Sequence, residues 1–259
     1  SNTDGDGPVL ILEATDFIER NQDRPFFLYL PYNQPHYPIQ PTIASLKAMS
    51  HIEDPGRRQY AACVYVLDDA VGRVVAAIEA QGLTHDTIIV FMSDHGHSVE
   101  AASLAGGRSA PYSGSKGTLL EGGIRVPCIA TWPGHYPAGV VRRQLVSSMD
   151  WLLTLASHAG ASTAMLVLDG HPLQDVIASE TAVVHDALCW THNEMWAVRE
   201  GRWKLLGEGS DQMSLYDLQA DPSESQDLLS QRHDIFRHLA HVRQGWAKGL
   251  RQDPTVIRE

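Results

Sequence analysis

Uninterrupted apolar runs and one amphipathic helical pattern alternate along the first half of the chain. PFFLYL at residues 25–30, TIIVFM at 87–92 and RVPCIAT at 125–131 are typical of strands buried on both faces. Residues 57–81 predict a helix, because apolar side chains recur every three or four positions, at Val64, Leu67, Val71, Val74 and Ile78. Gly82 follows where a helix end favours a left-handed backbone. Helices between buried strands predict an α/β fold, with a largely parallel or mixed central sheet flanked by helices.

The flanking segments extend this picture. Residues 8–21 predict a short helix with one apolar face, and the prolines of 31–41 predict a loop after the first strand. After about residue 180 the pattern changes to short strands with turns between them, in LCWTHNEMWAVRE, GRWKLLGEG and SLYDL. A helix is predicted over about 230–250, with one apolar side formed by Ile235, Leu239, Val242, Trp246 and Leu250. We therefore expect an α/β part at 1–180 and a small α+β subdomain at 181–259, with an antiparallel sheet and a C-terminal helix.

The composition narrows the classes of function. The 259 residues carry 20 basic and 31 acidic side chains, and the net charge of −11 argues against nucleic acids and anionic membranes as partners. No apolar run approaches the roughly 20 residues of a membrane span, and no signal segment opens the chain. We expect a soluble protein whose compartment stays unknown. Cys63, Cys128 and Cys189 lie far apart, so we expect buried, reduced thiols rather than a metal-binding Cys-x-x-Cys pair.

Polar side chains follow the predicted strand 87–92 directly, in the sequence SDHGH. Ligands of open α/β sheets bind outside the carboxyl ends of the strands, which is where Asp94 and His95 fall. A carboxylate oxygen and an imidazole nitrogen can ligate a divalent cation, although an aspartate turn with a solvent-facing histidine would give the same pattern. We expect His97 to belong to the loop rather than to the ligand set.

Two further residues are candidates for catalysis. His36 lies between prolines that stiffen its loop, and an imidazole held there could protonate a leaving group near neutral pH. A packed loop histidine is the alternative interpretation. Lys116 ends a long loop rich in glycine and serine, and its ammonium could face an anionic substrate or simply lie at the surface.

Other motifs exclude further classes. The chain contains neither a Gly-x-Ser-x-Gly elbow nor a phosphate-cradling P-loop, which leaves serine hydrolases and nucleotide-binding proteins without support. Asp68 and Asp69 lie opposite the apolar stripe of the 57–81 helix. We interpret them as surface or salt-bridging residues rather than as a metal site.

Five stretches together resemble the sulfatase family, within the alkaline-phosphatase-like hydrolases. They are PFFLYLPYNQPHYP, YAACVYVLDDAVGRVVAAIEAQGL, TIIVFMSDHG, SKGTLLEGGIRVPCIATWPG and LYDLQADPSESQDL. They occur in the family's order and span nearly the whole chain, and the set is specific although each stretch alone is loose. The resemblance implies an alkaline-phosphatase-like fold and a sulfuric ester hydrolase.

The resemblance also implies roles for the candidate residues. The family uses a divalent metal ion to hold a sulfate ester against a formylglycine made from cysteine or serine. Asp94 and His95 match metal ligands, with calcium as the first expectation and magnesium, manganese or zinc as alternatives, because many members have asparagine in place of His95. Lys116 matches the lysine that binds a sulfate oxygen, and His36 matches the histidine near the leaving oxygen. The substrate implied is a sulfated small molecule or glycan.

Part of the family's active site has no counterpart in the sequence. The Cys/Ser-x-Pro-x-Arg motif that supplies the nucleophile does not occur, and the early strand with two acidic metal ligands is not found. We expect the chain to be the C-terminal portion of a sulfatase, truncated at its N-terminus and with negligible turnover alone. We expect a homo-oligomer, or a partner chain that supplies the other half. The alternatives are a phosphonate or phosphate monoester hydrolase of the same superfamily and a non-catalytic remnant that binds an anion or a partner.

Overall fold

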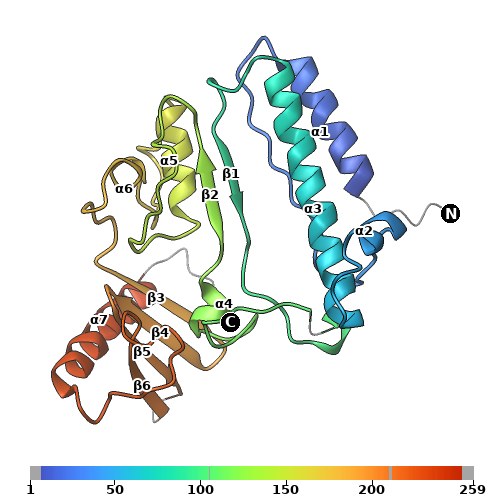
Figure 1. The fold of residues 1–259 in the computed structure, drawn as a ribbon. Coiled ribbons are helices and arrows are strands. Elements are labelled where there is room, and N and C mark those ends of the chain that lie inside the picture. The colour runs from blue at the N-terminus through green and yellow to red at the C-terminus, as the bar shows by residue number, and fades with distance from the viewer. Residues whose placement is uncertain (1–6, 105, 210–211, 253–259) are drawn as a thin grey trace. The chain divides into compact units, whose positions relative to one another are not determined.

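The computed structural model of the protein describes residues 7–104, 106–209 and 212–252 (Figure 1). The chain forms two compact units, which are described separately below. The first consists of Ser1–Arg108 with Pro127–Gly134, and the second of Ser109–Val126 with His135–Glu259. The domain boundary predicted near residue 180 lies inside the second unit and stays a prediction.

The first unit contains the two helices that the sequence predicts and one more. They are α1 (Gly7–Asn21), α2 (Ile43–Ala48) and α3 (Pro55–Ala80). Asp54 caps α3 by accepting a hydrogen bond from the backbone N–H of Arg57 at 2.6 Å. At the other end Gly82 has a φ of +71°, and the N–H of Leu83 donates to the carbonyl of Ile78 at 3.0 Å. These bonds satisfy polar groups that the helix itself leaves unpaired, and they end α3 at the predicted glycine.

Helix α3 packs against α1 through small and aliphatic side chains. The buried apolar residues described in the two helices are Ile11, Ala14, Ile18, Ala62, Cys63, Ala70 and Ile78. This face differs from the predicted stripe, of which only Ile78 is buried, while Val64 is 41% exposed. The short side chains of Ala62 and Ala70 allow α1 and α3 to approach each other closely. Helix α1 therefore covers a face of α3 that adjoins the predicted apolar stripe.

Residues 25–30 do not form the predicted buried strand. The segment lies outside any helix or strand, and Phe27 and Tyr29 are 75% and 76% exposed. A strand buried on both faces requires hydrogen-bonded neighbours and covering layers. The described residues provide neither for this segment, although its apolar pattern is typical of such a strand.

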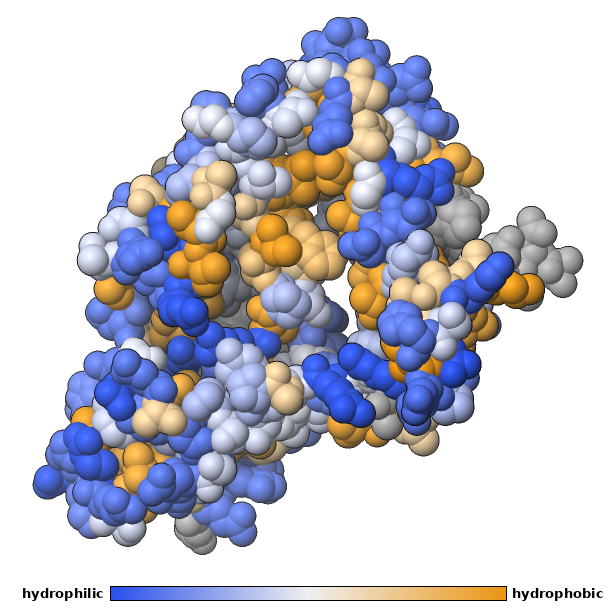
Figure 2. Space-filling model, viewed as in Figure 1, coloured by the Kyte–Doolittle hydropathy of each residue, from blue (hydrophilic) through white to orange (hydrophobic). Residues whose placement is uncertain are grey.

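The sheet of the first unit consists of β1 (Ile89–Met92) and β2 (Cys128–Thr131). The strands pair antiparallel, with Met92 opposite Cys128, which the mixed form of the predicted sheet allows and the largely parallel form does not. The described residues of the connection contain only a 3₁₀ turn, η1 (Ala101–Ser103), and the four-residue α4 (Glu121–Ile124), neither of which can act as the crossover helix of a parallel pair. Ile129 is 64% exposed, and Figure 2 shows apolar surface over these strands.

The second unit contains the antiparallel sheet that the sequence predicts. Its larger elements are α5 (Asp150–His158), α6 (Gln174–Ala178), β3 (Ala187–His192), β4 (Met195–Glu200), β5 (Trp203–Glu208), β6 (Gln212–Asp217) and α7 (His233–Gln252). The strands pair in chain order, β3-β4-β5-β6, and α7 packs on β3, β4 and β5 (Figure 1). Among the described residues no helix has both the length and the apolar character of a membrane span.

The core of the second unit lies between this sheet and α7. Its fully buried members are Trp196, Val198, Leu205, Leu215 and Leu239, and Ile235 and Val242 of the predicted apolar side of α7 pack against them. Gly207 lies under the Trp196 ring, since a Cβ at this position would come within 2.1 Å of a ring carbon. A glycine inside β5 therefore makes room for the indole, which explains why the strand tolerates it.

Candidate functional site

Asp94 and His95 lie directly after β1, as the sequence predicts. The backbone N–H of Ser93 donates to the carbonyl of Pro127 at 3.3 Å, and the Ser93 hydroxyl donates to the carbonyl of His95 at 3.0 Å. The backbone N–H of His95 donates to the Asp94 carboxylate at 2.9 Å. These bonds hold both residues in a bend at the end of the strand.

The His95 ring presents one nitrogen to the Asp94 carboxylate. Its Nδ1 lies 2.8 Å from the carbonyl oxygen of Gly96, which can only accept, so Nδ1 carries the hydrogen and Nε2 of the neutral ring carries a lone pair. Nε2 lies 3.2 Å from Oδ2 of Asp94. Two ligands of one cation have this separation, because bonds of about 2.0–2.4 Å at right angles place the ligand atoms about 3 Å apart. In the protonated ring the same contact is an ion pair.

The described residues add no third ligand to this pair. Side chains of Asp94 and His95 are 82% and 39% exposed, so both can be reached from solvent. No group of three or more His, Cys, Asp or Glu residues with metal-binding geometry occurs in the described ranges. The pair can therefore supply two positions of a coordination sphere.

His36 lies on the exposed loop predicted from its prolines. Its backbone N–H donates to Asn33 at 2.7 Å, and its Nδ1 donates to the carbonyl of Tyr37 at 2.7 Å. The imidazole also stacks on the Tyr37 ring, with 4.3 Å between the ring centroids. These contacts fix the orientation of the ring and leave Nε2 as the atom that can exchange a proton with a substrate.

A hydrogen bond joins the His36 loop to the loop after β1. Tyr37, the neighbour of His36, contacts Glu100, and this hydrogen bond together with the carboxylate charge raises the pKa of the Tyr37 hydroxyl. Both loops belong to the first unit. The structure therefore brings together the two segments that carry His36, Asp94 and His95.

His97 is a packing residue of this loop. A Cβ on Gly107 would lie 2.3 Å from the Cβ of His97, so the returning loop passes directly over the histidine. Burial, and secondly the positive charge of Arg57, lower the pKa of His97. Arg57 also donates to the carbonyl of Gly106, which ties the loop to the first turn of α3. These contacts agree with the expectation that His97 belongs to the loop.

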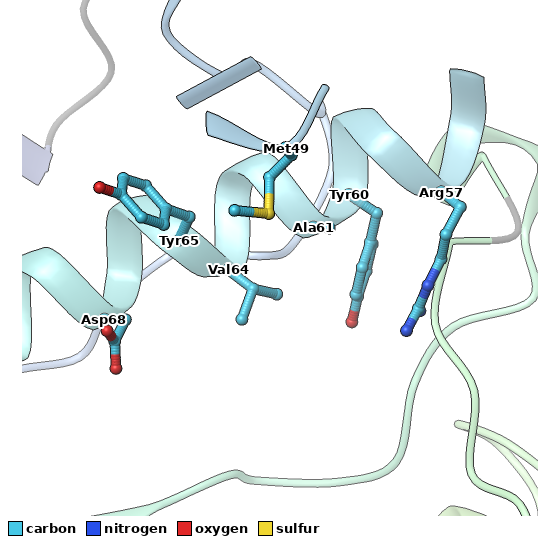
Figure 3. A pocket seen from close by; sticks show the side chains of 7 residues that line it. All are labelled: Met49, Arg57, Tyr60, Ala61, Val64, Tyr65 and Asp68. Carbon is cyan, nitrogen blue, oxygen red and sulfur yellow. The ribbon is translucent and has the colours of Figure 1, made fainter. Parts of the chain in front are cut away.

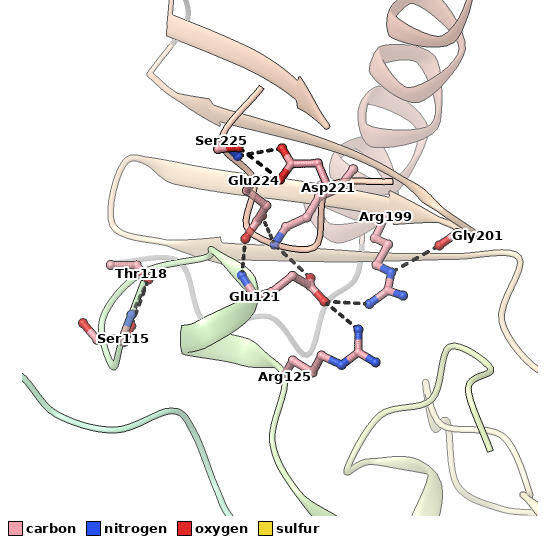
Figure 4. Close-up of polar contacts among 10 residues, drawn as sticks. Ser115, Thr118, Glu121, Arg125, Arg199, Gly201, Asp221, Glu224 and Ser225 are labelled. Atoms are coloured by element: carbon pink, nitrogen blue, oxygen red, sulfur yellow. Dashed lines mark hydrogen bonds and ion pairs between the residues drawn. The ribbon is translucent and has the colours of Figure 1, made fainter. Parts of the chain in front are cut away.

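Lys116 lies at the apex of a tight turn in the second unit. The N–H of Thr118 donates to the carbonyl of Ser115 at 3.0 Å, and Gly117 between them has a φ of +86°. A turn of this type needs glycine at its third position and places Lys116 at its second, where the lysine is half-buried. The Thr118 hydroxyl donates to the same carbonyl at 2.9 Å, and the N–H of Ser115 donates to that hydroxyl at 3.2 Å. The turn is thus braced by side-chain hydrogen bonds in addition to its backbone bond (Figure 4).

A buried ionic cluster follows this turn in the chain (Figure 4). The Glu121 carboxylate, 1% exposed, lies 3.0 Å from the Lys204 ammonium and 3.0 Å from the Arg199 guanidinium. Lys204 is fully buried and also lies 2.8 Å from Glu224. Burial raises the pKa of Glu224, and the positive charge of Lys204 opposes this effect. Sequence reasoning missed the cluster, although a lysine inside the apolar strand WKLLG is a signal for it.

A compact turn supports Glu224, which has a left-handed backbone with a φ of +55°. Asp221 accepts hydrogen bonds from the Ser223 hydroxyl at 2.6 Å and from the N–H groups of Ser225 and Gln226 at 2.7 and 2.8 Å. These donors, led by Ser223, lower the pKa of Asp221 to about 2. The carboxylate therefore organises the segment that delivers Glu224 to Lys204.

We expect Asp221→Asn to destabilise the second unit at pH 7, and by less at pH 3. The folded state favours the charged form of the Asp221 carboxylate. The stability that this charge contributes is therefore complete above the ordinary pKa of 3.8 and declines as the pH falls towards 2. Urea unfolding at the two pH values measures the difference, with Asp186→Asn at an exposed position as the control. A deficit that does not depend on pH would contradict this assignment.

A second buried carboxylate ties three other segments of this unit together. Asp150 is fully buried and lies 2.8 Å from Nε2 of His185. It also accepts from the N–H of Ser147 at 2.7 Å and of His171 at 2.9 Å. All the polar contacts of Asp150 are internal, which indicates a structural role that the sequence pattern did not suggest.

An open groove of about 320 Å³ lies along the exposed side of α3 (Figure 3). It is lined by Met49, Arg57, Tyr60, Ala61, Val64, Tyr65 and Asp68. None of the four predicted site residues lines it. Asp68 and Asp69 are exposed, in agreement with their interpretation as surface residues.

The cysteines differ from the prediction in one case. None of the three forms a disulfide, and Cys63 is buried. Burial raises the pKa of Cys63, and it raises the pKa of the half-buried Cys189 to about 11. Cys128 is exposed, because its strand β2 has no covering layer among the described residues.

The sequence matches the family described as Sulfatase over residues 7–161. The chain belongs to the sulfatase family. A second match, to the family described as N-sulphoglucosamine sulphohydrolase, C-terminal, covers residues 115–241. The predicted family is thereby confirmed, including the block that contains Lys116 and the segment around Asp221.

Curated sulfatases are similar to the chain over most of its length. Human arylsulfatase A is 33% identical over 238 residues, which cover 81% of this chain and 45% of that protein. Pig N-acetylgalactosamine-6-sulfatase is 34% identical over 199 residues, which cover 76% of this chain and 37% of that protein. The chain therefore spans about half or less of the length of these relatives.

Solved structures share the fold. Ps i-CgsB in complex with k-i-k-neocarrahexaose superposes with a TM-score of 0.87 at 30% identity, covering 98% of this chain and 57% of that one. The phosphonate monoester hydrolase of Agrobacterium radiobacter has a TM-score of 0.53 at 24% identity, covering 75% of this chain and 40% of that one. The likeness to these solved structures confirms the predicted α/β class with its small antiparallel part.

Proposed function

We propose that the chain supplies one part of the active site of a sulfuric ester hydrolase that acts on a sulfated sugar or aryl sulfate. The observation that carries the proposal is the contact between Asp94 and His95, where an acceptor nitrogen and a carboxylate oxygen lie 3.2 Å apart at the end of β1. Membership of the sulfatase family supports the reaction class. The names of the relatives, an arylsulfatase and an N-acetylgalactosamine-6-sulfatase, support the substrate class.

The donor set fits a divalent cation. Carboxylate oxygen and neutral imidazole nitrogen suit calcium and magnesium through Asp94, and manganese or zinc through His95. A bound cation would stabilise negative charge on the sulfate oxygens as a Lewis acid. The hydrogen bond from His95 Nδ1 to Gly96 fixes the ring so that Nε2 faces the site, as is usual for a ligating histidine.

His36 and Lys116 would act on the ester itself. His36, oriented by Tyr37, would donate a proton from Nε2 to the leaving oxygen, which converts an alkoxide or phenoxide into a neutral alcohol or phenol. The Lys116 ammonium, presented by its turn, would pair with a sulfate oxygen. No Cys/Ser-x-Pro-x-Arg motif occurs in the sequence, so we propose that the nucleophile comes from residues outside these 259 and that this chain alone has negligible turnover. A second copy or a partner chain that completes the site stays a prediction.

Binding of a divalent ion tests the proposal directly. We expect Mn²⁺ to broaden the imidazole NMR signals of His95 and Ca²⁺ to compete with it, with an affinity near the millimolar range because only two protein ligands are present. In Asp94→Ala the affinity should fall at least about tenfold, because half of the donor set is removed.

Asp69→Ala, at an exposed carboxylate on α3, is the matched control and should bind as the unaltered chain does. Broadening of His95 that persists in Asp94→Ala at the same Mn²⁺ concentration would contradict the assignment. Tighter binding of zinc and manganese than of calcium would favour the phosphonate or phosphate monoester hydrolase that His95 suggests as the alternative.

A further inference from the structure

The turn that carries Lys116 rests directly on the backbone of α4. The N–H of Gly122 donates to the carbonyl of Ser113 at 2.7 Å. A Cβ on Gly122 would lie 2.5 Å from that carbonyl oxygen, and a Cβ on Gly123 would lie 2.3 Å from the carbonyl oxygen of Thr118. The two glycines allow backbone to pack on backbone, so the turn must follow any displacement of α4.

Ionic contacts with the C-terminal sheet fix α4 in turn. The backbone N–H of Glu121, the first residue of α4, donates to the Glu224 carboxylate at 2.6 Å. The Glu121 carboxylate accepts from Lys204 on β5 and from Arg199 on β4, each at 3.0 Å. The backbone of the first residue of α4 is therefore held by a carboxylate, and its side chain by Lys204, by Arg199 and, at 3.6 Å, by Arg125 of the same segment (Figure 4).

Two charged side chains of this cluster are almost completely buried. Glu121 and Lys204 are 1% and 0% exposed, so each has lost its hydration. A buried ion pair contributes little net stability compared with apolar residues of the same volume, and its best attested use is to select one arrangement of the groups that it joins. Here the groups joined are the sheet and the short helix under the Lys116 turn.

We propose that the ionic cluster of Glu121, Lys204, Glu224 and Arg199 positions Lys116 for the anion that it binds. The proposal rests on the proposed function in one respect, that Lys116 contacts a sulfate oxygen. Such a contact depends on placement within about 1 Å, and a turn on an unsupported four-residue helix would not hold it. The C-terminal sheet then acts in sulfate binding without contacting the sulfate.

Amide hydrogen exchange on the full chain tests the positioning role. Arg199→Gln and Glu224→Gln are suitable variants, because Arg199 is partly exposed and the glutamine at 224 keeps an acceptor for the Glu121 N–H. We expect the amides of Thr118 and Gly122 to exchange at least about tenfold faster in both variants, while those of Val198 and Leu205 stay within about twofold. Arg202→Gln is the matched control, because it breaks the Arg202–Asp217 pair of the same sheet, which includes no residue of the cluster or of α4.

Titration with sodium sulfate, followed by the Lys116 amide signal, gives the second readout. Both variants should bind sulfate about tenfold more weakly than the unaltered chain, and Lys116→Ala should not bind it. If the unaltered chain does not bind sulfate, the proposed role of Lys116 fails, and the exchange rates still decide whether the cluster holds the turn. Unchanged exchange at Thr118 and Gly122, or equal acceleration at Val198 and Leu205, would overturn the positioning role.

Discussion

Replacement of Lys204 by methionine is expected to lower the free energy of unfolding of the second unit by about 3–5 kcal/mol, the usual loss when one partner of a buried ion pair is removed. Methionine fills a similar volume, so the loss arises from charge. Glu121 and Glu224 would remain buried with their shared cation gone, and the remaining cations, Arg199 and Arg125, both pair with Glu121. Urea unfolding followed by far-ultraviolet circular dichroism and tryptophan fluorescence measures this change.

The pH dependence identifies the cause of this loss. Burial already raises the pKa of Glu224, and Lys204 is the main group that opposes the rise. In Lys204→Met the Glu224 carboxyl group should take up a proton at a higher pH than in the unaltered chain. The loss in free energy of unfolding should therefore be smaller at pH 5 than at pH 8. Lys248→Met at an exposed position of α7 is the matched control, expected within about 0.5 kcal/mol of the unaltered chain. A deficit under about 1 kcal/mol, or one that grows towards low pH, would contradict this account.

The triple variant with Glu121→Gln and Glu224→Gln added to Lys204→Met separates charge from packing. It removes both uncompensated carboxylates together with the cation. We expect it to regain most of the stability lost in the single variant, because uncharged groups of equal volume often replace a buried ionic group at little cost. The position of Lys116 should nevertheless be lost, and sulfate binding measured on the same samples checks this separation.

The helices and the C-terminal sheet could be predicted because their signals are local. The apolar side of α7 and the glycine that ends α3 lie within a few residues of the structure that they specify. The strands β3 to β6 pair with their neighbours in the sequence, so short turns determine the topology. In these regions the pattern and the structure agree.

The central sheet could not be predicted in the same way. An apolar run indicates that a segment can be buried, but it does not identify the strand with which that segment pairs. Residues 25–30 and β1 have similar apolar runs, yet only β1 pairs with a strand within the described residues. The direction of the β1–β2 pair depends on the route of the chain between the strands, which carries no periodic signal. The buried strand predicted at residues 25–30 is therefore wrong, whereas the strands predicted at 87–92 and 125–131 form and pair with each other.

The candidate site shows the same division. Asp94 and His95 could be found because they are adjacent in the sequence and follow a strand, and the structure places them in contact. The contact between Glu121 and Lys204 joins residues 83 positions apart, and the lysine inside the apolar strand WKLLG indicates burial without identifying its partner. No spacing rule reaches across such a distance, so the support of the Lys116 turn was visible only in the structure.

Replacement of Gly123 by alanine is expected to cost about 1–3 kcal/mol and to displace the Lys116 turn. The added Cβ would lie 2.3 Å from the carbonyl oxygen of Thr118 and 2.6 Å from that of Ser115. Both atoms belong to the backbone of the turn, so a side-chain rotation cannot relieve the contact. The turn must move away from α4, and the hydrogen bond from Thr118 to Ser115 should exchange faster as a result.

Gly245→Ala in α7 is the matched control for this substitution, and its effect on the free energy of unfolding should have the opposite sign. No atom lies within 4 Å of the added Cβ at this helical position, so alanine should stabilise the unit by about 0.5–1 kcal/mol through helix propensity. Urea unfolding of both variants and amide exchange at Thr118 provide the measurements. If Gly123→Ala were as stable as the unaltered chain and kept the slow exchange of Thr118, the turn would not depend on its contact with α4. Loss of stability together with faster exchange at Thr118, and neither in Gly245→Ala, would establish that this contact holds Lys116 in place.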